Sequence, residues 1–256
     1  MKTTWRRLKH HYYQRHLRRK DLPEGIRNYL QAFHDFDFDK PITETEFVIF
    51  DTETTGLNVK RGDRIVSISG VRLKEGRIDL SDAFHEIVNP NRDIPSASAV
   101  IHEILPRMVN GKPTIEKVLP DFIRYIGISV LVAHHEWLDM SFLNREMACL
   151  YGIPIQNIVL DTAVLDQALL AKKTPASMIA TMKIDSTLDA VAERYHVAVE
   201  GLHSSFWDAL ATAQIFQQMI KEVQGLGILS LKDFLKLAHR PPSLGAFKPD
   251  HFSGSV

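Results

Sequence analysis

Two acidic residues, Asp51 and Glu53, stand at the end of a short apolar run in the stretch FVIFDTETTGL. Residues two apart on a β-strand point to the same side, so the two carboxylates can face one point in space. Like charges this close are unfavourable unless a cation lies between them. Carboxylate oxygens on a rigid strand end suit Mg²⁺ or Mn²⁺. The stretch therefore predicts a divalent metal site, although two isolated acids with this spacing are more often a solvated strand end.

Two further acids and a histidine occur later in positions that suit the same site. Asp139 follows the apolar run LVA in the stretch LVAHHEWLD, and His203 comes five residues before Asp208 in HSSFWDALATA. An acid near a helix N-terminus is also favoured by the helix dipole, and an isolated histidine is more often a surface or core residue. The helix dipole accounts for an acid at any helix start, but it does not account for the position of Asp139 after a predicted buried strand.

Taken together, these stretches resemble the DEDDh superfamily of 3′–5′ exonucleases, and in particular the epsilon proofreading subunit of bacterial DNA polymerase III. The family's first motif commonly reads DTETTGL, its second H-N-A-x-F-D and its third H-x4-D-A-x-x-T-A. The resemblance spans roughly residues 46–220. In the second motif His134 and the acid match, whereas His135, Glu136 and Leu138 replace Asn, Ala and Phe.

The resemblance implies hydrolysis of the 3′-terminal phosphodiester with two Mg²⁺ or Mn²⁺ ions per active site. Asp51 would bridge both ions, and Glu53 and Asp208 would complete the first. Asp139 would hold the rest of the site. His203, neutral near pH 7, would act as general base and take the proton from the attacking water.

Other polar residues have weaker assignments. The resemblance places Thr54, Thr55 and His102 at the 3′-terminal nucleotide. Asp161 matches a common family position, but we expect it to cap a helix. Three further acids are expected to be solvated helix residues: Asp166, Asp185 and Asp189.

These residues need a scaffold that brings strand ends and helix starts together. Short apolar or alternating runs predict strands at about 47–53, 64–73, 78–88, 128–133 and 158–160, the first three as an antiparallel meander. Thr54, Thr55 and Gly56 are expected to turn the chain sharply after the first strand, where Gly56 is free to take a positive φ. Apolar spacing predicts helices at about 97–105, 115–126, 139–150, 162–171, 187–195, 204–223 and 230–238, and a loop at 172–186. This pattern indicates an α/β fold, and the resemblance implies a ribonuclease H-like fold with a mixed five-stranded sheet flanked by helices.

The chain divides into three predicted parts. Residues 1–45 form a basic N-terminal helical extension and lead-in, residues 46–223 the exonuclease domain, and residues 224–256 a short helix and flexible tail. Residues 1–20 carry eight basic and no acidic side chains, whereas residues 41–256 carry a net charge of −5. The basic arm therefore predicts contact with nucleic acid or anionic lipid, with packing on the domain as an equal alternative.

The single cysteine, Cys149, excludes an internal disulfide and is expected to be a buried thiol, which favours a reducing cytoplasm. No apolar run is long enough to span a bilayer.

Single-stranded nucleic acid, DNA rather than RNA, is the expected substrate. The alternatives are RNA 3′-end processing, a non-catalytic binding module, and an accessory subunit in which the nuclease is secondary. Proofreading would need a polymerase partner.

Overall fold

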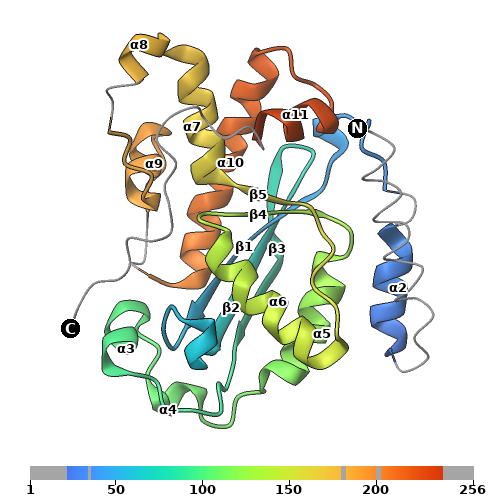
Figure 1. Cartoon of the computed structure of the whole chain (residues 1–256), viewed down its shortest axis with the longest axis vertical. Coiled ribbons are helices and arrows are strands. Elements are labelled where there is room, and N and C mark those ends of the chain that lie inside the picture. Colours follow the sequence, from blue (N-terminus) through green and yellow to red (C-terminus); the bar gives the residue numbers. More distant parts are fainter. Residues whose placement is uncertain (1–21, 34–35, 180–182, 200–202, 239–256) are drawn as a thin grey trace.

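A mixed five-stranded sheet forms the centre of the computed structural model, with the strand order β3-β2-β1-β4-β5 (Figure 1). The structure describes residues 22–33, 36–179, 183–199 and 203–238, so the predicted arm and tail lie outside it. The strands are β1 (Phe47–Thr54), β2 (Ile65–Lys74), β3 (Arg77–Ile87), β4 (Val130–Ala133) and β5 (Val159–Asp161).

Strand β1 runs antiparallel to β2 and parallel to β4. Its pairing with β2 extends along the whole strand, whereas its pairing with β4 covers only Phe47 to Ile49. The last residues of β1 thus project beyond β4 and have a free edge on that side. The β2–β3 hairpin is antiparallel and β4–β5 is parallel, which confirms the predicted meander and mixed sheet.

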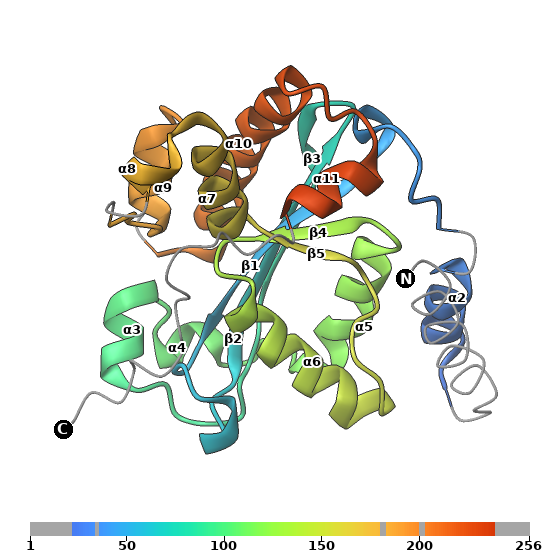
Figure 2. The same cartoon turned by 45° about the horizontal axis from the view of Figure 1, so that its top comes forward.

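Helices cover both faces of the sheet, with α5 and α6 on one side and α7, α10 and α11 on the other (Figure 2). The helices are α2 (Glu24–Ala32), α3 (Ser96–His102), α4 (Pro106–Val109), α5 (Ile115–Ile126), α6 (Trp137–Tyr151), α7 (Thr162–Lys173), α8 (Ala176–Ile179), α9 (Leu188–Arg194), α10 (Ser205–Gly225) and α11 (Leu231–Ala238). Single 3-10 turns occur at η2 (Ile42–Glu44) and η3 (Val59–Arg61).

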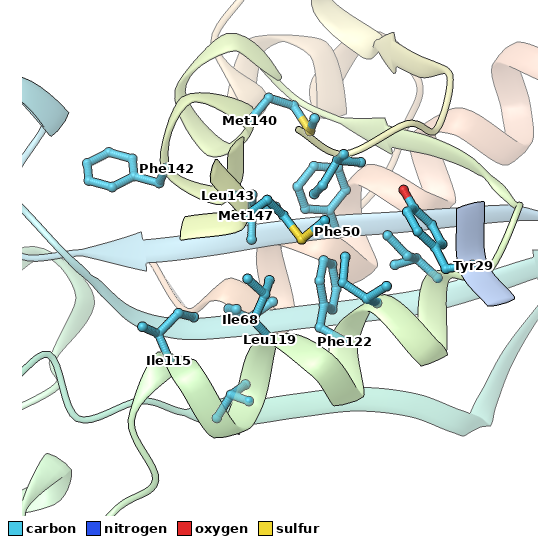
Figure 3. Packing of buried hydrophobic residues seen from close by; sticks show 14 of the residues in the cluster. Tyr29, Phe50, Ile68, Ile115, Leu119, Phe122, Met140, Phe142, Leu143 and Met147 are labelled. Carbon is cyan, nitrogen blue, oxygen red and sulfur yellow. The ribbon is translucent and has the colours of Figure 1, made fainter. Parts of the chain in front are cut away.

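The core on the α5/α6 face is built from even-numbered residues of β1 together with apolar helix faces (Figure 3). Phe50 lies at the centre, with its ring centroid 6.1 Å from that of Phe122 on α5. Tyr29 of α2 packs into the same cluster, and its hydroxyl donates to Asn157 Oδ1 at 2.6 Å. The lead-in segment around α2 therefore packs on the core.

The opposite face of β1 carries odd-numbered residues against α10. Phe47 contacts Phe216 of α10 and Phe234 of α11, with ring centroids 5.0 and 6.4 Å away. Because side chains alternate along a strand, Asp51 and Glu53 belong to this face. The packing of α10 on Phe47 and Ile49 thus directs its first turn toward the two acids.

Two sequence-based expectations, for Cys149 and for the loop 172–186, differ from the structure, and the conformational freedom of Gly56 is not used. Cys149 is exposed, because it lies on the outer side of α6. Gly56 does not take a positive φ; a Cβ there would lie 2.5 Å from Asp63 Oδ2, so close approach of this carboxylate explains the glycine. The predicted loop 172–186 contains the short helix α8. Among the described residues, no helix is long and apolar enough to cross a membrane.

Candidate active site

Three carboxylates meet where β1 ends. Asp51 and Glu53 come from the strand, Asp208 comes from α10, and one oxygen of each lies within 4.8 Å of the others. Both strand acids lie on the α10 face, and α10 begins at Ser205, so that Asp208 stands in its first turn. Strand alternation and helix packing therefore bring together residues that are more than 150 positions apart in sequence.

Asp139 approaches the same strand end from the free edge of β1. Its Oδ1 accepts hydrogen bonds from the backbone N–H of Thr52 at 2.9 Å and from the Thr52 hydroxyl at 2.6 Å. A parallel strand would normally occupy this edge, but the pairing with β4 has ended at Ile49. The carboxylate is buried, and its charge is close enough to raise the pKa of Asp51.

The four acids hold their protons unusually strongly. Burial raises the pKa of Asp51 well above its usual value, and the charges of the other three carboxylates raise it further. Burial and then Asp208 and Asp139 raise the pKa of Glu53 to about 8. Burial also raises the pKa of Asp139 to about 7, against the opposing effect of the Thr52 hydrogen bonds, and that of Asp208 to about 6. Full ionisation of this cluster near neutral pH therefore requires a cation.

His203 lies beside Asp208, just before α10. Its backbone has a φ of +55°, and its side chain is exposed. The coulombic effect of this histidine lowers the pKa of Asp208, although burial of the carboxylate has the larger, opposite effect. The imidazole is thus within electrostatic range of the acids and open to solvent.

Helix α3 closes the other side of the turn that follows β1. The Ser98 hydroxyl donates to the carbonyl of Thr55 at 2.9 Å. His102 is buried, and its Nδ1 accepts from the backbone N–H of Ile104 at 3.1 Å. Its Nε2 is buried without a hydrogen bond, and burial lowers its pKa, with a smaller opposing effect from the Thr54 backbone. The structure thus brings His102 next to Thr54. The resemblance assigns both residues to the 3′-terminal nucleotide.

His134 lies directly after β4, and its ring contacts two other segments of the chain. Its Nε2 lies 2.8 Å from the carbonyl of Ser186 and must donate, because a carbonyl only accepts. Burial lowers its pKa to about 4, so the ring is neutral and Nδ1 accepts from the Thr162 hydroxyl at 2.8 Å. This histidine therefore ties the end of β4 to the segment before α9.

Of the acids with weaker assignments, Asp161 is a helix cap, as predicted: it accepts from the N–H of Ala163 at 2.8 Å. Asp185 and Asp189 are exposed, as predicted. Asp166 contradicts its prediction, because it is fully buried and bonded to Arg194 at 2.6 Å. Helical spacing alone did not reveal that α9 covers this face of α7.

Sequence reasoning missed the groups that surround the acids. Thr52 holds Asp139, and three buried serines at positions 67, 69 and 205 lie beside the strand acids. One signal was present: Ser67 and Ser69 alternate with Ile68 in an otherwise apolar strand, on the face that Val71 and Leu73 place in the core.

The donor set fits a hard divalent cation. Three carboxylates lie within 4.8 Å of one another and a fourth lies next to them, and burial, followed by the charges of neighbouring acids, raises the pKa values of Asp51 and Glu53. Oxygen-only ligands of this kind are typical of Mg²⁺ and Mn²⁺ sites.

Residues 48–216, about two thirds of the chain, match a family model described as exonuclease. The chain belongs to this exonuclease family. The matched range includes all four acids and His203.

Individual relatives agree with the family. A DNA polymerase III subunit epsilon-like protein of Rhodobacter capsulatus is 34% identical over 210 residues, which are 77% of this chain and 28% of that protein. The structure of exonuclease X in complex with 5′ overhanging duplex DNA is 26% identical, with a TM-score of 0.51 over 68% of this chain and 91% of that one. The nuclease domain of 3′hExo, described as a DEDDh family member bound to rAMP, shares the fold at 18% identity and a TM-score of 0.57, over 72% and 95% of the two chains. The chain thus spans less than a third of the length of the Rhodobacter capsulatus relative.

Proposed function

We propose that the chain is a metal-dependent 3′–5′ exonuclease that releases nucleoside monophosphates from the 3′ end of single-stranded DNA. The observation that carries this proposal is the convergence of Asp51, Glu53 and Asp208 within 4.8 Å, in a chain of the exonuclease family. The DNA complex of exonuclease X and the name of the Rhodobacter relative favour DNA over RNA and a polymerase as partner.

The acids have the following roles in this proposal. Asp51, Glu53 and Asp208 would hold two Mg²⁺ or Mn²⁺ ions together with Asp139, and Thr52 keeps Asp139 in position through its two hydrogen bonds. Bound ions of this class neutralise phosphate charge, activate water and stabilise the leaving oxygen.

The remaining site residues move a proton or hold the substrate. His203, exposed beside Asp208, accepts the proton of the attacking water on an imidazole nitrogen. Thr54 and Thr55 hold the 3′ end through the backbone that follows Glu53. His102, with its buried and unbonded Nε2 next to Thr54, contacts the terminal nucleotide.

The test is degradation of matched 5′-labelled DNA and RNA single strands in Mg²⁺ and Mn²⁺, with Asp51→Asn and chelator as controls. We expect stepwise shortening from the 3′ end, faster on DNA, and a loss of several orders of magnitude in Asp51→Asn. Chelator-resistant cleavage, or near-normal cleavage by Asp51→Asn, would contradict the metal mechanism. Faster cleavage of RNA would instead favour 3′-end processing of RNA.

A further inference from the structure

Three buried serine hydroxyls connect strand β2 to the first residue of α10. Ser205 Oγ lies 2.7 Å from Ser67 Oγ and 2.7 Å from Ser69 Oγ, and Ser69 Oγ lies 2.7 Å from His85 Nδ1 of β3. All three serines are buried. A buried hydroxyl is costly unless it is bonded, so this chain of contacts holds the helix start to the sheet. We call Ser67, Ser69 and Ser205 the hydroxyl clamp.

The register of the sheet places the clamp beside the strand acids. Ser69 is the β2 partner of Asp51, and Ser67 is the partner of Glu53. Directly opposed residues of an antiparallel pair point to the same face. Each serine of β2 therefore stands next to one carboxylate, on the face where α10 begins.

Among the described residues, no side chain caps the N-terminus of α10 through a hydrogen bond. Ser204 makes no capping hydrogen bond, and Asp208 lies three residues beyond Ser205 on the same side of the helix. Asp51 and Glu53 repel the carboxylate of Asp208, which acts to push this turn away from β1. The two bonds of Ser205 oppose that displacement.

We propose that the hydroxyl clamp positions the carboxylate of Asp208 against β1 for metal binding. The serines are positioning residues, since they act through the helix start and not on the substrate. The inference rests on the proposed metal-dependent function and deepens it. Groups that orient metal ligands in this way typically contribute about 10–100-fold to metal affinity or activity.

The test is a Mn²⁺ titration of the full chain without nucleic acid, followed by the EPR signal of free Mn²⁺. We expect Ser205→Ala to bind Mn²⁺ about 10–100-fold more weakly than the unchanged protein. Ser129→Ala is the matched control, because it also removes a buried, bonded hydroxyl, at 2.9 Å from Glu46 Oε1, but at the opposite end of β1. Its Mn²⁺ affinity should be unchanged.

Cleavage of a short single strand gives a second readout. In Ser205→Ala the KM for the strand should stay the same, while kcat falls at limiting Mn²⁺ and recovers as Mn²⁺ is raised. A purely structural role would lower the melting temperature without this dependence on metal concentration.

Two further variants keep the test decisive if Ser205→Ala does not fold. Ser67→Ala and Ser69→Ala each remove one bond to Ser205, the latter together with the contact to His85, and each should weaken Mn²⁺ binding. Mn²⁺ affinity within twofold of the unchanged protein in all folded clamp variants would overturn the inference. Failure of the proposed function looks different: the unchanged protein would bind no Mn²⁺, or Asp51→Asn would bind it equally well.

Discussion

Replacing Glu53 by Gln should stabilise the metal-free protein at alkaline pH while removing its capacity to bind metal. Burial and the charges of Asp208 and Asp139 raise the pKa of Glu53 from 4.5 to about 8. The folded-state pKa is above the unfolded one, so the folded protein binds this proton more tightly. The associated stability is fully present below about pH 4.5 and is lost as the pH rises through about 8. A glutamine avoids this loss because it never ionises.

The size of the expected gain in stability follows from the shift in the pKa of Glu53. Each pKa unit corresponds to about 1.4 kcal/mol, so the shift of Glu53 taken alone amounts to about 5 kcal/mol. Part of it arises from neighbouring acids whose own pKa values are also raised, so we count roughly half, about 2 kcal/mol, for this substitution. For a chain of this size, such a gain raises the melting temperature by about 4–8 °C.

Thermal unfolding followed by circular dichroism in chelator at pH 5, 7 and 9 measures this gain. We expect the melting temperatures of the two proteins to agree at pH 5 and to diverge by pH 9, where the variant is more stable. Addition of Mn²⁺ at pH 9 should reverse the order, since only the unchanged protein binds the ion. Glu75→Gln, in the exposed β2–β3 turn, is the control and should change nothing. A variant that melts at or below the temperature of the unchanged protein at pH 9 in chelator would refute the reasoning.

Three other substitutions or deletions give separate tests. His203→Ala should reduce kcat about 10²–10⁴-fold with little change in Mn²⁺ affinity, and an unchanged rate would show that another group takes the proton. Arg194→Ala leaves Asp166 buried without its ion-pair partner, which should cost about 3–5 kcal/mol in chemical denaturation, and an unaltered denaturation midpoint would contradict the importance of this pair. Deletion of residues 1–20 should reduce the slope of log K for single-strand binding against log salt concentration by roughly 2–3. This assumes that three or four of the basic side chains contact phosphates, each contributing about 0.7 to the slope. Equal slopes with and without the arm would exclude that electrostatic role.

The local pattern of the chain was sufficient to predict most helices and strands. The apolar run before Asp51 predicted a central buried strand, and helical spacing predicted α5 with the bounds that the structure has. The predicted helices at 187–195 and 230–238 are present, with Thr187 capping α9 and Ser230 bonded to Asp233 at the start of α11. Such features depend on residues within a few positions of each other, so sequence spacing contains the information.

Other features depended on which elements pack together, and spacing does not contain that information. Asp166 has the same helical setting as a solvated acid, and only the approach of α9 buries it against Arg194. Asp139 lies next to Asp51 because β4 ends early and leaves the N–H of Thr52 free to donate to its carboxylate. The sequence was enough to show that Asp51 and Glu53 share one side of β1. The tertiary structure decided their separation and their pKa values, because both depend on the burial and charge that distant segments supply.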